Sequence, residues 1–178
     1  NGNASGTDYF TYTIEDADGD RSTAVLSFNV ADQAQGTITG SALVYEDGIA
    51  DQNTGGTTVT PQPLGISFTP NDNEQLTSLT LKALPIGWKI YDGASLLFTG
   101  AGVDVSIDTT VNLLANLTIL PPTDNADGDI SLNIEGALLD PTGGLTSTIT
   151  GTLTVQRDAV ADLPNNVQII VTDSADGG

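Results

Sequence analysis

The stretch DISLNIEGALLDPTGGLTSTITGTLTV, residues 129–155, contains the pattern from which the fold class is inferred. Every second residue from Ile130 to Ile134 is apolar, and from Ile149 to Val155 every second residue is apolar or glycine. Such alternation is typical of strands that bury one face, and the Asp-Pro-Thr-Gly-Gly run between them is typical of a turn. The stretch therefore predicts two strands joined by a short connection.

The same period of two recurs along the chain, with Gly, Pro, Asp and Asn between the alternating segments. Thr is frequent, which favours strands over helices. The other alternating segments are residues 10–14, 24–30, 79–81, 103–107, 117–119 and 167–171. Only TTVNLLANL, residues 109–117, suits a helical turn. Many short strands with turn residues between them predict an all-β, antiparallel β-sandwich.

Two parts of the chain resemble each other. Residues 8–32 and residues 129–162 both contain a strand, a turn and a second strand, and both finish in Val-Ala-Asp. We interpret residues 1–32 as the C-terminal hairpin of a preceding sandwich repeat, 36–160 as a complete repeat, and 161–178 as the first strand of the next. The sequence thus predicts part of a tandem array. It leaves open whether the two end segments pair within the chain or between molecules.

Composition excludes several classes of function. The 178 residues include 23 acidic and 4 basic side chains, a net charge of −19, and no Cys, His or Met. Without His or Cys there is no Ser–His–Asp triad, no Cys nucleophile, and no imidazole or thiolate ligand for zinc, copper or iron–sulfur clusters. The negative charge disfavours nucleic acid and anionic lipid, and no apolar run approaches the roughly 20 residues of a membrane span.

Two acidic stretches, EDADGD at 15–20 and DNADGD at 124–129, lie next to predicted strands. Their candidate ligands are Asp16, Asp18, Asp20, Asp124, Asn125, Asp127 and Asp129. Ca²⁺ takes six to eight oxygen ligands, and oxygen donors are what this chain offers. Neither stretch has the spacing of an EF-hand, so we expect calcium sites built from several loops. The alternative is a solvated turn, because Asp-Gly turns are common in hairpins without metal.

Five stretches in order give a resemblance to a known family: YTIEDADGDRSTAVLSFNVAD, VYEDGIA, ISFTPNDNEQLTSLTLKALPIGWKI, LANLTILPPTDNADGDISLNIEG and GTLTVQRDAVADLP. Together they resemble the Ig-like or cadherin-like extender repeats of giant bacterial RTX (repeats-in-toxin) adhesins, which are exported by type I secretion and include biofilm and ice adhesins. The resemblance covers most of the chain. It implies a β-sandwich, Ca²⁺ within and between repeats, and a secreted protein at the bacterial cell surface.

The resemblance also implies further calcium ligands, in the opening acidic pair, a mid-domain loop and the linkers. These residues are Glu46, Asp47, Asp72, Asn73, Glu74, Asp158, Asp162 and, for the preceding repeat, Asp32. An ion in a linker would fix the angle between two repeats. The leading hypothesis is therefore a calcium-stabilised extender that spaces the adhesive tip from the cell, with neighbouring repeats of the same adhesin as partners.

Two departures from the family pattern keep an alternative open. Trp88 replaces the usual small residue after the Leu-Pro turn, and residues 53–63 are a longer insertion than the family has. With Tyr91, they suggest a module that binds a glycan or a protein, although a lone Trp in a sandwich more often fills the core. Asp127 and Asp129 could imitate a glycosidase pair, but no second motif supports catalysis, and we expect no enzyme.

Overall fold

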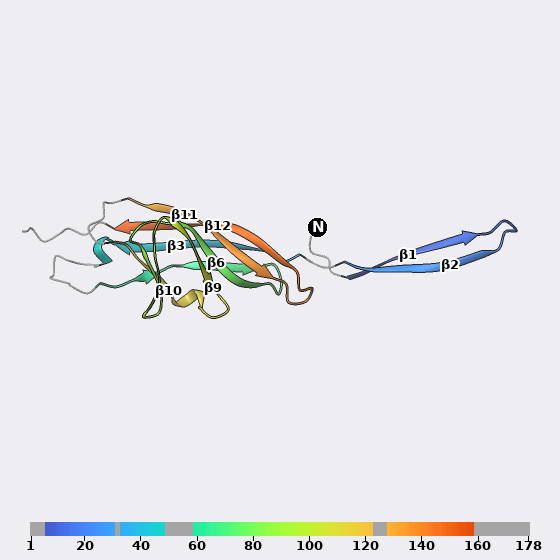
Figure 1. The fold of residues 1–178 in the computed structure, drawn as a ribbon, viewed down its shortest axis with the longest axis horizontal. Helices are drawn as coiled ribbons and strands as arrows, with labels where there is room; N and C mark the ends of the chain where they lie inside the picture. The colour runs from blue at the N-terminus through green and yellow to red at the C-terminus, as the bar shows by residue number, and fades with distance from the viewer. Residues whose placement is uncertain (1–5, 31–32, 49–58, 123–127, 159–178) are drawn as a thin grey trace, which may run out of the picture.

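The computed structural model describes residues 6–30, 33–48, 59–122 and 128–158, and strands make up most of it (Figure 1). Strands β1 (Gly6–Glu15) and β2 (Arg21–Val30) form an antiparallel hairpin, which projects beyond the end of a larger two-sheet body. The predicted all-β class is confirmed. The division into tandem repeats stays a prediction.

The larger body, here called the sandwich, contains two sheets. The six-stranded sheet has the order β5-β3-β12-β11-β6-β9, and the four-stranded sheet has the order β4-β10-β7-β8. Their bounds are β3 Gly36–Tyr45, β4 Gln62–Pro63, β5 Ile66–Pro70, β6 Gln75–Leu84, β7 Lys89–Asp92, β8 Ser95–Thr99, β9 Val103–Asp108, β10 Leu117–Leu120, β11 Ile130–Leu139 and β12 Thr146–Asp158. Two 3₁₀ turns, η1 (Glu46–Gly48) and η2 (Leu114–Asn116), complete it, and η2 lies where the sequence predicts a helical turn.

Residues 129–155 form β11 and most of β12, at the centre of the six-stranded sheet. The two strands pair antiparallel over ten residue pairs, from Ile130 opposite Val155 to Leu139 opposite Thr146. The connecting turn is held by the buried Asp140, whose carboxylate accepts hydrogen bonds from the N–H groups of two turn residues at 2.7 and 2.9 Å. The hydrogen-bonded turn and the alternation of apolar residues therefore specify the same pairing register for β11 and β12.

The core lies between the two sheets. The six-stranded sheet contributes Leu79, Leu81 and Leu153, and the four-stranded sheet contributes Ile90 and Ile119, all fully buried. Burying side chains of this size stabilises the fold by about 1.5–3 kcal/mol each. The alternating positions along these strands point outward and are polar, as a sheet with one solvated face requires.

One strand pair differs from the expected antiparallel arrangement. β12 lies beside β3 and runs parallel to it, from Leu153 opposite Gly40 to Asp158 opposite Tyr45. A parallel pair needs a long crossover connection, and here most of the sandwich, from β4 to β11, provides it. Consequently β3 begins at the end of the sandwich near the hairpin, called the hairpin end, and β12 finishes at the opposite end, called the distal end (Figure 1).

Candidate metal centre

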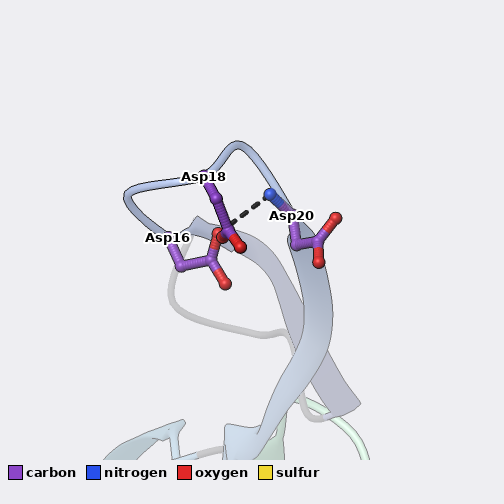
Figure 2. Close-up of side chains that lie close together, drawn as sticks. All are labelled: Asp16, Asp18 and Asp20. Carbon is purple, nitrogen blue, oxygen red and sulfur yellow. Dashed lines mark hydrogen bonds between the residues drawn. The ribbon is translucent and has the colours of Figure 1, made fainter.

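The turn between β1 and β2 brings three carboxylates together (Figure 2). Oxygen atoms of Asp16, Asp18 and Asp20 all lie within 4.8 Å of one another, and all three residues are exposed. The turn is closed by the N–H of Asp16, which donates to the Asp20 carbonyl at 3.0 Å, and by that of Gly19, which donates to the Asp16 carbonyl at 3.1 Å. Gly19 has a φ of 93°, which favours glycine, so EDADGD folds locally into this cluster.

Hydrogen bonds hold the Asp16 carboxylate in its charged form. The Asp18 carboxyl group, and next the backbone N–H of Asp20, lower the pKa of Asp16 below its usual value. The N–H of Asp20 donates to Asp16 Oδ1 at 2.9 Å. At the base of the turn, Arg21 pairs with Glu15 at 2.6 Å, and both side chains are largely exposed, so this ion pair adds little stability.

The donor set at the hairpin tip fits a hard divalent cation. Three carboxylates supply three to six oxygens, and water can complete the six to eight ligands that Ca²⁺ takes. The carbonyls of Asp16 and Asp20 are already used in the turn. With all three carboxyl groups ionised, as binding of a cation requires, the cation would offset the repulsion among three adjacent negative charges.

At the hairpin end of the sandwich, three predicted ligands, Asp72, Asn73 and Glu74, lie in the β5–β6 turn. Glu74 is buried, and its two carboxylate oxygens accept the N–H groups of Gln35 at 3.0 Å and Asp72 at 2.8 Å. The bond from Asp72, and then that from Gln35, lowers the pKa of Glu74. The exposed Asp72 accepts the N–H of Asn73. The carboxylate of Glu74 therefore joins the start of β3 to this turn.

At the distal end, three predicted ligands lie near the finish of β3 and β12. Glu46 begins η1, Asp158 ends β12 opposite Tyr45, and Asp129 precedes β11. Asp129 Oδ1 accepts the N–H of Arg157 at 3.2 Å. Among the described residues only the hairpin tip gathers three acidic groups within ligand distance, so these acids are not joined into one such group. Five predicted ligands (Asp32, Asp124, Asn125, Asp127 and Asp162) and the side chain of Asp47 lie outside the described residues.

The sequence did not predict two carboxylates on the sandwich, Asp104 and Glu135, that form hydrogen bonds or ion pairs between strands. Asp104 accepts the N–H of Ala83 at 2.9 Å and pairs with Lys82 at 3.2 Å, and both contacts lower its pKa, that with Ala83 the more. Lys82 also pairs with Glu135 at 3.2 Å, and the two partners, Glu135 first, raise the pKa of Lys82. No local motif marks these residues, because their partners come from neighbouring strands.

Trp88 belongs to the core, with 2 % of its surface exposed. The guanidinium of Arg157 lies 5.7 Å from the centre of its ring. A cation over the face of a Trp ring is attracted by the ring quadrupole. The interpretation of Trp88 as a core residue is confirmed, and its ring is not presented to solvent as a platform for a sugar.

Comparisons of the chain with protein-family models, with curated proteins and with solved structures found no match. Within the described part of the chain, no helix has the length and apolar character needed to cross a membrane.

Proposed function

We propose that this chain is a calcium-stabilised extender module of a secreted bacterial cell-surface adhesin, which spaces an adhesive tip from the cell. The observation that carries the proposal is the parallel pairing of β3 and β12. Because the first and last strands of the sandwich run in the same direction, the chain begins at one end of the sandwich and leaves at the other. Modules with this path join end to end and add length, as an extender requires.

Acidic side chains accompany this path at three levels. They occur at the hairpin tip, at the hairpin end of the sandwich with Asp72 and Glu74, and at the distal end with Asp129 and Asp158. With a net charge of −19, the chain repels itself strongly at low ionic strength. Ca²⁺ bound at the hairpin tip, and at the two ends of the sandwich with further ligands from outside the described residues, would reduce the repulsion and stiffen the ends. This is the task that the resemblance to RTX adhesin repeats implies.

The proposed partners are neighbouring repeats of the same adhesin, and the proposed work involves no catalysis. A glycan or protein ligand is less favoured, because Trp88, one of the two aromatic residues on which that alternative depends, is buried. Tyr91 is half-buried, and residues 53–58 of the insertion lie outside the described residues.

The experiment is thermal unfolding in Ca²⁺ and in chelator, with Mg²⁺ at equal ionic strength as the control for screening. If Ca²⁺ is present at ten times the Kd of one native-state site, the stabilisation is about 1.4 kcal/mol. For a sandwich of this size that raises the Tm by about 3–6 °C. Equal Tm values in Ca²⁺, Mg²⁺ and chelator would refute the calcium part of the proposal. A small-angle scattering profile showing a compact rather than an elongated particle would refute the extender part.

A further inference from the structure

The hairpin has one apolar face that nothing in the described structure covers. Phe10 lies opposite Leu26 and Tyr12 opposite Ala24, and Phe10 stacks on Phe28 with ring centroids 5.8 Å apart. Phe10, Tyr12 and Leu26 are 61, 53 and 57 % exposed. The other face is mainly polar, with Thr13 opposite Thr23 and Thr7 opposite Asn29. An amphipathic two-stranded sheet is marginally stable alone, and a third strand with its apolar residues on the same face would stabilise it.

The sandwich shows what a hairpin of this kind pairs with. Both β1–β2 and β11–β12 pair over ten residue pairs, and each hairpin carries apolar residues at alternate positions. In the sandwich, the outer edge of β12 receives β3 as a parallel strand. Among the described residues, the corresponding edge of β2 has no such neighbour, because β1 and β2 form a two-stranded sheet.

We propose that the edge of β2 receives residues 166–173 of a second copy of this chain as a parallel strand, so that copies associate head to tail. That segment, NVQIIVTD, alternates Val167, Ile169 and Val171, which is the pattern of a strand with one apolar face. Added beside β2, it extends the hairpin to three strands with their apolar residues on one face. Main-chain hydrogen bonds supply affinity in this mode of recognition, and alternate side chains supply the register.

The length of the chain favours a second copy over the same copy. β12 finishes at the distal end, whereas the hairpin projects from the opposite end (Figure 1). A parallel strand on β2 would start near the hairpin tip. To reach that point from the end of β12, the chain would have to pass along the ten residues of β3 and the ten residues of β2. That path measures at least about 66 Å at 3.3 Å per residue. Residues 159–165 span at most about 25 Å. The contact is therefore heterologous, and repeated association gives open filaments.

The test uses sedimentation equilibrium of the full chain and of two single-site variants, in Ca²⁺ and in chelator. Leu26→Lys places a charge on the apolar face of the hairpin, and Ile169→Lys does the same in the C-terminal segment. The matched control is Ser27→Lys, one residue along β2 on the opposite, polar face, which adds the same charge. A second hairpin variant, Leu26→Thr, keeps a residue of high β-propensity in case the lysine unfolds the hairpin.

The apparent mass of the unmodified chain, and that of Ser27→Lys, is expected to rise with concentration above the monomer mass of 18.2 kDa and beyond that of a dimer. Each of the other variants alone is expected to remain monomeric, and an equimolar mixture of Leu26→Lys with Ile169→Lys is expected to form a 1:1 dimer and nothing larger. This is because the mixture contains one intact hairpin and one intact C-terminal segment that can meet. Self-association of Ile169→Lys alone would overturn the proposal in favour of hairpin-to-hairpin contact. A monomeric unmodified chain up to millimolar concentration would overturn it altogether. We expect the same association in chelator, because the strand contact does not involve the calcium sites. The proposal of head-to-tail association and the proposal of calcium binding can therefore fail independently.

Discussion

Gly151 provides a direct test of the parallel pairing on which the end-to-end path depends. It lies in β12 on the core side of the six-stranded sheet, where β12 passes β3. A Cβ at this position would lie well inside the contact distance of the Ile38 carbonyl oxygen, 2.9 Å from the carbonyl carbon and 3.1 Å from Ile38 Cγ2. Backbone atoms cannot rotate away as a side chain can, so Gly151→Ala must push the two strands apart.

Overpacking of a well-packed core costs about 1–3 kcal/mol, and we expect Gly151→Ala at the upper limit, about 3 kcal/mol. At about 2–4 °C per kcal/mol, the Tm falls by about 6–12 °C. Urea unfolding followed by the fluorescence of Trp88, the single Trp and a buried one, measures the loss. The control is Gly6→Ala, whose Cβ would meet nothing within 4 Å, and which should lie within about 0.5 kcal/mol of the unmodified chain. If Gly151→Ala is equally harmless, β12 does not pass this close to β3, and the path through the sandwich is wrong.

Three further predictions concern carboxylates. Asp140→Ala leaves two N–H groups of the β11–β12 turn without their acceptor and should destabilise the sandwich by about 1–3 kcal/mol in the same urea assay, whereas an unchanged midpoint would show that the turn does not need this carboxylate. The folded state lowers the pKa of Glu74 below 4.5, so the ionised Glu74 stabilises the fold above that pH, and this stabilisation is lost as the pH falls through the folded-state pKa. Glu74→Gln should therefore lose less stability than the unmodified chain over this acid range. Parallel profiles of stability against pH for the two proteins would contradict this. Asp18→Asn should weaken the calcium-dependent shift of the Gly19 amide signal in NMR while the Tm of the sandwich stays constant, and Asp8→Asn, with the same loss of charge away from the tip, should leave that shift unaltered.

The sequence predicts local features of this fold better than distant ones. Alternation and turn residues are contiguous, so the hairpin of β11 and β12 can be derived from residues 129–155 alone. The parallel pairing of β3 with β12 joins residues more than a hundred positions apart, and nothing near Gly40 or Leu153 marks the partner. Whether two distant strands pair parallel or antiparallel depends on how all the strands of the sandwich are arranged, and a local sequence pattern does not contain that information.

The same distinction holds for the candidate site. EDADGD gathers its three carboxylates because one turn carries them all. Asp104 escaped prediction because its partner, Ala83, adopts a φ of 49° at an irregularity in β6. Such a conformation is uncommon for a residue with a side chain, and it arises from the pairing of β6 with β9 rather than from a sequence signal. The carboxylate of Asp104 stabilises the exposed backbone there.

The parallel pair also determines how the sandwich would respond to tension. A force applied between the start of β3 and the finish of β12 acts along two strands that lie side by side and point the same way. The strands would have to slide lengthwise past each other, so the hydrogen bonds of the six paired positions from Leu153 to Asp158 resist together rather than opening one after another. The hairpin differs, because its strands are antiparallel and joined at the tip, and pulling its two ends apart would open it pair by pair from Gly6 and Val30. Shear strength is therefore concentrated in the sandwich, and the hairpin is the element that yields first.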